Sequence, residues 1–135
     1  MAFEGWLLKF GTQEFPHELI NYGSWKSTPN QRQELEAWTD NNGFLHRETV
    51  SHYRTKIEFE TVDDLSLEEK MRIQSVMKSS IINERERKGE ITYWNDETNA
   101  YVKAQVYVPD TQFTIAEISE TDIRYNKIRI ALIEY

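Results

Sequence analysis

Cysteine is absent from this sequence, which excludes disulfide bridges, thiolate metal sites and cysteine nucleophiles. Long apolar runs are absent too, because no stretch approaches the roughly 18 apolar residues that a transmembrane helix needs. The opening stretch, MAFEGWLLKFG, has neither the basic region nor the cleavage site of a signal peptide. These absences predict a soluble protein that is made in a reducing cytoplasm and has no membrane contact.

Motifs for catalysis and nucleotide binding are also missing. The sequence has no GxGxxG or GxxxxGK[ST] phosphate loop and no G-x-S-x-G elbow. His46 and His52 could share one face of a strand, but they would lie about 20 Å apart, too far to share a metal. The adjacent carboxylates at 63–64, 68–69 and 96–97 fall at a helix start or in a turn, where local structure explains them. We therefore predict no enzyme, with no catalytic residue, no cofactor and no metal.

The charge balance is acidic, with a formal net charge of −7 over 135 residues. A conventional DNA- or RNA-binding module needs a basic face, so this class is disfavoured. An acidic surface serves solubility, and it would also suit the wall of a conduit through which DNA passes without being held. Hydrophobic residues make up 39% of the chain, enough for one folded domain over residues 1–135.

The N-terminal part is predicted to contain one strand followed by a loop. Residues 3–10 alternate, with Trp6, Leu8 and Phe10 on one face of the predicted strand. Residues 12–24 contain several turn-forming residues and are predicted to be loop with one short extended piece at 18–22.

The segment after residue 24 admits two interpretations. T-P-N-Q at 28–31 has the form of a helix start with a capping box. Only Leu35, Ala37 and Trp38 could supply an apolar stripe for such a helix, which is too few for a buried face. A helix over 29–38 therefore remains the less favoured alternative to an extended arm.

The favoured interpretation is a long β-hairpin. D-N-N-G at 40–43 is a strong turn, since Asn and Gly accept positive φ at low cost. Residues 44–61 then alternate as one long strand, with Ile57 and Phe59 facing inward. The outer half of this hairpin is too polar to serve its own core. We therefore predict an arm over about residues 30–56 whose packing partner is another subunit.

One helix is clearly indicated. Ser66 and Glu69 form a capping box, and the helix is predicted over about residues 66–83. Its apolar face would consist of Leu67, Met71, Ile73, Met77, Ile81 and Ile82.

Strands are predicted to complete the chain. Residues 90–94 and 101–108 flank a polar turn at 95–99, and further strands cover 113–118 and 124–135. The order of elements predicts a mainly β (α+β) fold, an antiparallel sandwich or barrel with one flanking helix and a long hairpin arm.

Aromatic and turn residues of the arm are candidates for contacts between subunits, because Trp, Tyr and Arg carry much of the energy of protein interfaces. The predicted subunit interface consists of Trp25, Trp38, Asn41, Asn42, Gly43, Phe44, Leu45, His46, Arg47, His52 and Tyr53.

Several stretches together carry a family resemblance. TPNQRQELEAWTDNNGFLHRETVSH, TKIEFETVDDLSLEEKMRI, ITYWNDETNAYVKAQVYVPD and IRYNKIRIALIEY resemble a family of short structural proteins from tail gene clusters of tailed phages and prophages of Gram-positive bacteria. The resemblance implies a tail-tube-like fold and a location in the virion, in the phage tail. It also implies a homo-oligomer, usually a hexameric ring, of the tail tube or its distal end. Other tail proteins would be its partners, and DNA would pass through the lumen without specific binding.

Two alternatives stay open at this point. The first is a head–tail connector or tail terminator, and the second is a small phage enzyme or host-interaction factor. The lumen could be lined by the face of Tyr101, Lys103 and Gln105 or by the last strand.

Overall fold

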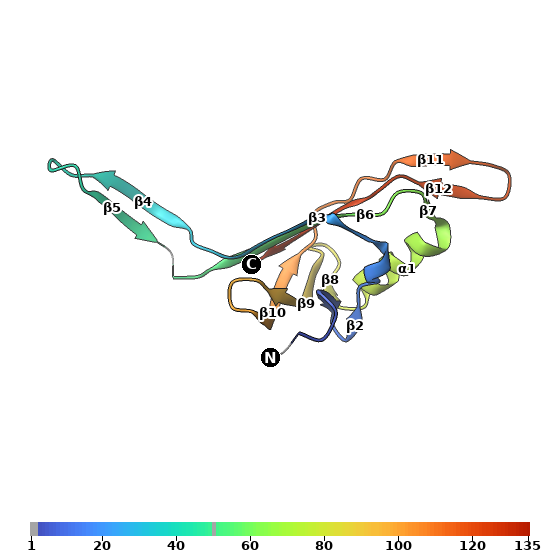
Figure 1. Cartoon of the computed structure of the whole chain (residues 1–135), viewed down its shortest axis with the longest axis horizontal. Helices are drawn as coiled ribbons and strands as arrows, with labels where there is room; N and C mark the ends of the chain where they lie inside the picture. The colour runs from blue at the N-terminus through green and yellow to red at the C-terminus, as the bar shows by residue number, and fades with distance from the viewer. Residues whose placement is uncertain (1–2, 50) are drawn as a thin grey trace.

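An eight-stranded antiparallel sheet that curls over on itself forms the body of the protein in the computed structural model, which describes residues 3–49 and 51–135 (Figure 1). The strand order is β2-β1-β9-β10-β13-β6-β3, and β8 pairs with β9. The strands are β1 (Leu8–Phe10), β2 (Gln13–Glu14), β3 (Ile20–Gln31), β6 (Arg54–Thr61), β8 (Ile81–Asn83), β9 (Lys88–Asn95), β10 (Ala100–Tyr107) and β13 (Arg129–Glu134). The predicted mainly β, antiparallel fold is confirmed.

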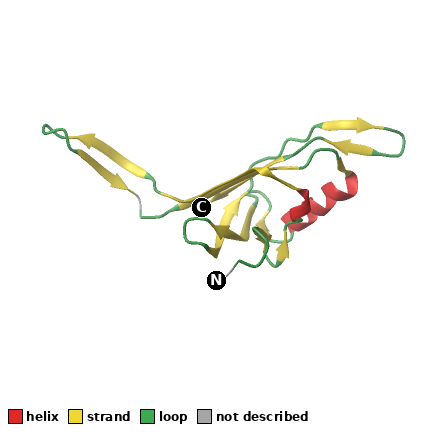
Figure 2. Cartoon of the chain, viewed as in Figure 1, coloured by secondary structure: helices red, strands yellow, loops and turns green. Residues whose placement is uncertain are grey.

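The sheet bends where β10 meets β13. These two strands pair at Val106 with Glu134 and at Tyr107 with Ile133, near one end of each strand. Beyond this corner they diverge, so that β3, β6 and β13 form one layer and β1, β9 and β10 lie beneath it (Figures 1 and 2). The core fills the space between the layers.

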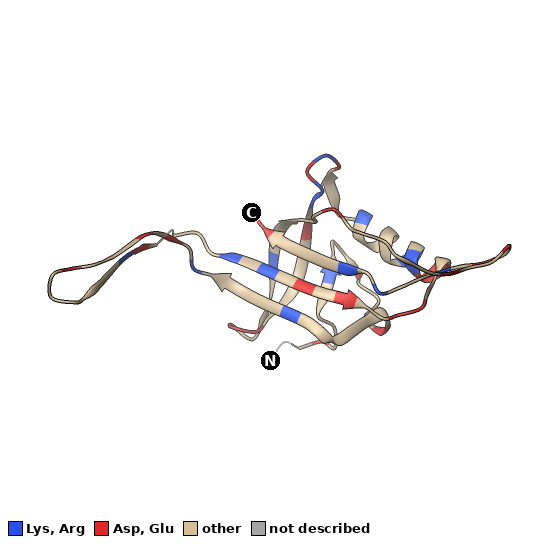
Figure 3. Ribbon diagram, turned by 90° about the horizontal axis from the view of Figure 1, so that it is seen from above, with Lys and Arg blue, Asp and Glu red and all other residues tan. Residues whose placement is uncertain are grey.

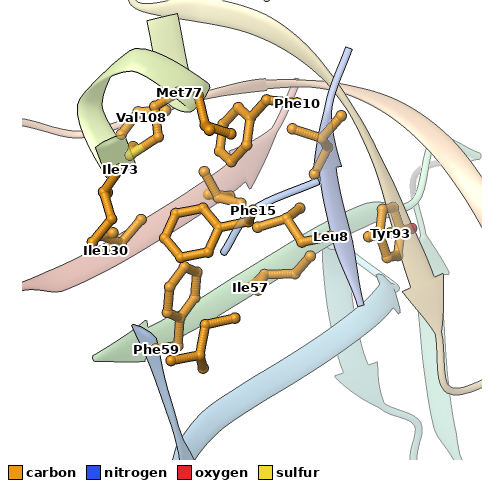
Figure 4. Packing of buried hydrophobic residues seen from close by; sticks show 14 of the residues in the cluster. Leu8, Phe10, Phe15, Ile57, Phe59, Ile73, Met77, Tyr93, Val108 and Ile130 are labelled. Carbon is orange, nitrogen blue, oxygen red and sulfur yellow. The ribbon is translucent and has the colours of Figure 1, made fainter. Parts of the chain in front are cut away.

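Alternating side chains of both layers meet in this core (Figure 4). Ile57 and Phe59 of β6 are 1% and 0% exposed, which confirms their predicted inward face. Trp6 is buried as well, although β1 is shorter than the strand predicted over residues 3–10. Further core residues are Leu8, Phe10, Phe15, Ile91, Tyr93, Ala104, Val106, Val108, Ile130 and Leu132.

The segment 12–24, predicted to be loop with a short extended piece at 18–22, contains more regular structure than expected. It contains β2, a 3-10 helix (His17–Leu19) and the start of β3. Phe15 and Leu19 are buried, and the Phe15 N–H donates to the Leu8 carbonyl at 3.0 Å. Contacts with the distant core therefore determine the conformation of a segment whose local sequence signals mainly turns.

The helix α1 (Leu67–Lys78) begins where the capping box predicted. The Ser66 hydroxyl accepts from the Glu69 N–H at 3.2 Å, and the Glu69 carboxylate accepts from the Ser66 N–H at 3.0 Å. The helix buries Ile73 and Val76, together with Met77 near its end. It thereby covers one open end of the body.

The helix ends five residues before the predicted residue 83. Residues 81–83 instead form β8, which pairs with β9. A Cβ at Gly89 of β9 would lie 3.1 Å from the Ser80 carbonyl oxygen, so this glycine permits the close approach of the turn after α1. The predicted apolar face is accordingly only partly right, because Met71 and Ile82 are exposed.

Ser66→Ala is expected to lower the free energy of unfolding by about 1 kcal/mol, because it leaves an N-terminal N–H of α1 without its acceptor. Urea denaturation followed by circular dichroism measures the change. Ser75→Ala, at an exposed mid-helix position, is the matched control and should change stability by less than about 0.5 kcal/mol. An equal loss in both variants would contradict the role of the cap.

Two smaller sheets project from the body at opposite ends of its long axis (Figure 1). One consists of β4 (Glu34–Thr39) and β5 (Leu45–Thr49), and the other of β7 (Leu65–Ser66), β11 (Ile115–Ile118) and β12 (Ile123–Tyr125). The strand predicted over 124–135 is thus two strands, because residues 126–128 carry the chain from the second small sheet into the body. Within the part of the chain that the structure describes, no helix is long and apolar enough to span a membrane.

Candidate subunit interface

The arm, residues 32–53, is the largest projection from the body (Figure 1). Its strands β4 and β5 form a sheet of two strands, and every residue of both strands is exposed. The favoured hairpin is therefore confirmed over the helix alternative. The strand predicted over 44–61 is interrupted between β5 and β6, and its position 50 lies outside the described residues. An isolated two-stranded hairpin is only marginally stable in water. Because the strands of the arm are exposed on both faces, packing against another chain would stabilise them.

The backbone at the base of the arm explains why no helix forms there. Asn30 has a φ of 53°, outside the right-handed helical region. The pairing of β3 with β6 shifts register between Thr28 and Gln31, which marks a bulge. This irregularity redirects the chain from the body into the arm.

Asp40 organises the turn at the tip of the arm. Its carboxylate accepts from the N–H groups of Asn42 at 2.9 Å and Phe44 at 3.0 Å, and Gly43 has the positive φ of 84° that favours glycine. A hydrogen bond from His46, followed by that from the Phe44 N–H, holds the pKa of Asp40 below its usual value. These contacts therefore stabilise the turn above the ordinary pKa of the carboxyl, and their contribution is lost as pH falls through the lowered pKa.

Cross-strand pairs stiffen the arm. The rings of Trp38 and His46 stack with centroids 5.3 Å apart and planes at 13°, and Glu34 pairs with Arg47. In the next residue pair of the hairpin, Leu45 lies opposite Thr39. These pairs restrict the conformations of the free arm, which lowers the entropy that is lost on binding.

Large apolar groups are nevertheless exposed along the arm. Leu35 is 72% exposed, Phe44 68%, Leu45 63% and Trp38 45%. Several exposed large apolar side chains on one projection are typical of a protein contact site.

A salt bridge joins the root of the arm to the turn between β9 and β10. The Arg32 guanidinium contacts both oxygens of Glu97, at 2.9 and 2.6 Å, and lies 4.8 Å from the centre of the Tyr53 ring. The hydrogen bond from Arg32 lowers the pKa of Glu97. His52, also at the root, contacts the carbonyl oxygen of Tyr135.

A buried polar network lies beneath this root. The Thr55 hydroxyl accepts from the Asn30 N–H at 3.1 Å and lies 2.8 Å from the Tyr93 hydroxyl. Asn95 is 1% exposed, and its amide donates to the Tyr93 hydroxyl at 3.3 Å. Burial raises the pKa of Tyr93, so the phenol remains a neutral hydrogen-bonding group. Sequence analysis missed this network, whose sole signal is that Thr55 lies on the same predicted inward face as Ile57.

Thr55→Val is expected to cost about 1–3 kcal/mol of folding stability, because it keeps the side-chain shape but leaves a part-buried N–H and a buried phenol short of a partner. It should also speed tryptic cleavage within the arm, since the network holds the arm to the body. Urea denaturation and limited proteolysis measure these effects. The control is Thr49→Val, whose hydroxyl is on the exposed arm; equal effects in both variants would contradict the network's role.

The predicted interface residues do not all lie together. Trp38 and residues 41–47 form the outer arm, while His52 and Tyr53 lie at its root. Trp25 lies apart from them on β3 in the body, half-buried, where its ring stacks on Phe59 with centroids 5.0 Å apart.

A second hairpin, residues 113–125, projects from the opposite end, and sequence analysis did not single it out. Phe113, Ile115 and Ile118 are 44%, 54% and 72% exposed. The strand predicted over 113–118 gave these apolar side chains no core partner, and this was the signal that could have marked them.

The outer face of the layer β3, β6 and β13 carries charges of both signs (Figure 3). Glu58 pairs with Lys56 at 3.6 Å and with Arg129, and Glu60 pairs with Lys127 at 3.3 Å. Exposed pairs of this kind add little stability, and their mixture of signs differs from a basic stripe that binds nucleic acid. Among the described residues, no three His, Cys, Asp or Glu side chains are grouped so that they could hold a metal.

Comparisons with known proteins give a family and a similar fold. A model described as a family of unknown function (DUF6711) matches residues 1–135, and no curated protein matches the sequence. A solved structure described as the tail of an empty GTA particle, computed with helical refinement and C6 symmetry, is similar with a TM-score of 0.51. It shares 11% sequence identity, and the match covers 99% of this chain and 95% of that chain. At this identity the similarity concerns the fold.

Proposed function

The chain belongs to DUF6711, a family of unknown function, and we propose that it is a non-enzymatic structural component of a phage-type tail. The arm carries this proposal, because its strands are exposed over their whole length and present large apolar groups to a partner. A tail-like fold over 99% of the chain supports the same role.

We further propose that the protein forms hexameric rings of the tail tube or its distal end, and that it resides in the virion tail. The similar structure is described with C6 symmetry. A projecting arm with its contact site on another copy is a heterologous interface, which forms a ring where the rotation between copies closes. DNA passes through the lumen of such rings without specific binding, in agreement with the net charge of −7. Other tail proteins are the remaining partners.

Purified full-length protein tests this proposal. Light scattering should show an assembly six times the 16.1 kDa mass of the chain whose fraction rises with concentration, and negative-stain microscopy should show rings or short tubes. A particle that stays monomeric at every concentration, or a discrete dimer without ring symmetry, would contradict it.

A further inference from the structure

We propose that the tip of the arm docks into an apolar groove beside α1 of a second copy of this chain. This inference rests on the proposed function and names the acceptor of the arm within the assembly. Phe44 and Leu45 are the inserted side chains.

The acceptor groove lies between α1 and residues 108–113. Its free volume is about 70 Å³, which exceeds the space of a single water molecule several-fold and admits the end of an apolar side chain. Buried side chains from several elements form its floor: Ile73, Met77, Val108, Ile128 and Ile130. Four of them lie close together in Figure 4. Phe113, 44% exposed, forms part of its rim.

Charge selects the arm as the occupant. The groove is lined by three cations and one carboxylate, namely Lys70, Lys78, Arg87 and Glu84. The arm between residues 34 and 49 has the opposite balance, with four carboxylates and one cation, Arg47. Glu34 pairs with Arg47, and Asp40 binds the turn and His46, so Glu36 and Glu48 are the carboxylates that face the groove cations in this proposal. Complementary surfaces of this kind favour one partner over others and accelerate encounter.

The cations of the groove are available for such a partner. The Lys70 ammonium lies 4.8 Å from the centre of the Phe113 ring and 4.7 Å from that of Tyr125, so it stays at the rim of the apolar surface. Neither Lys70 nor Lys78 takes part in an ion pair among the described residues. Arg87 is 3.7 Å from the exposed carboxylate of Asp110. A carboxylate of the incoming arm would take the place of Asp110 in this pair.

The occupant must come from another copy. The arm and α1 lie at opposite ends of the long axis of the molecule (Figure 1), so the tip cannot reach the groove of its own chain. The hairpin 113–125 is a poorer acceptor, although it exposes apolar side chains. It has three carboxylates, Glu117, Glu120 and Asp122, and one cation, Arg124. This negative balance would repel an acidic arm.

Disulfide trapping tests the contact, and the cysteine-free sequence supplies a clean background. Full-length Asn42→Cys protein, with a tag that shifts its mass, is mixed with Thr111→Cys protein and oxidised. Asn42 lies in the tip turn and Thr111 lines the groove, so both apolar anchors stay intact. The matched control replaces Thr111→Cys by Thr121→Cys, at the tip of the second hairpin. We expect the mixed dimer with Thr111→Cys to form several-fold more than that with Thr121→Cys, and to decrease with added salt.

Each outcome decides the proposal. Equal or greater cross-linking at Thr121, or none at Thr111, overturns the groove as acceptor, whether or not wild-type rings form. Rings without the Thr111 cross-link would reject the groove alone and leave the tail role intact. Cross-linking at Thr111 in a protein that never forms rings would support the contact and contradict the tail role. As a second measurement, Lys70→Glu with Lys78→Glu should suppress the cross-link, and Glu36→Lys with Glu48→Lys in the arm partner should restore it.

Discussion

Replacing both Phe44 and Leu45 by aspartate is expected to abolish assembly while the monomer remains folded. The two side chains are 68% and 63% exposed in the isolated chain, so the body does not depend on them. In the assembly each would contribute about 1.5–3 kcal/mol by burial, and a carboxylate in the same place would carry a desolvation cost instead. A combined loss of about 4 kcal/mol or more corresponds to an association constant lowered about a thousandfold.

Light scattering and negative-stain microscopy measure the loss of assembly, and thermal unfolding by circular dichroism reports the fold. The matched control, Thr49→Asp with Ser51→Asp, adds the same charge to exposed positions near the root and should still assemble. Deletion of residues 41–43 should act like the aspartate pair, because it removes the turn that presents the tip. If the aspartate pair and the deletion both still form rings, the arm is not the subunit contact.

Phe59→Ala should lower the free energy of unfolding by about 3–5 kcal/mol, because it removes a ring at the centre of the core. Phe59 is 0% exposed, and its ring packs edge-on against Phe15 at 5.2 Å and face-on against Trp25 at 5.0 Å. Deletion of the ring thus leaves a cavity between both layers and releases the stacked tryptophan. Denaturation followed by intrinsic tryptophan fluorescence detects both effects.

Phe44→Ala is the control for the core substitution. It removes the same ring from an exposed position and should change monomer stability by less than about 0.5 kcal/mol. A comparable loss in the two variants would mean that the arm packs on its own body. The two substitutions also separate the roles of aromatic residues here, since one affects folding and the other assembly.

Sequence reasoning succeeded where a few neighbouring residues decide the structure. The capping box at Ser66 and Glu69 placed the start of α1, and the turn at 40–43 placed the tip of the arm. Alternation placed Ile57 and Phe59 in the core. Sequence reasoning failed where remote contacts compete with local preference. The helix α1 stops at Lys78 because the residues after it pair with β9, and nothing in the local sequence of the helix indicates this pairing.

The sequence by itself determined the start of α1, the turn of the arm and the inward face of β6, since caps, turns and alternation act through backbone geometry within a few residues. It also indicated an arm without a core of its own, because polar alternation cannot bury either side. Tertiary structure alone decided how that arm is held to the body. The Arg32–Glu97 bridge spans 65 positions, and the Thr55–Tyr93 contact spans 38. The groove beside α1 likewise exists only once the helix and the segment after β10 are brought together, because burial of the shared core, and no local preference, places them side by side.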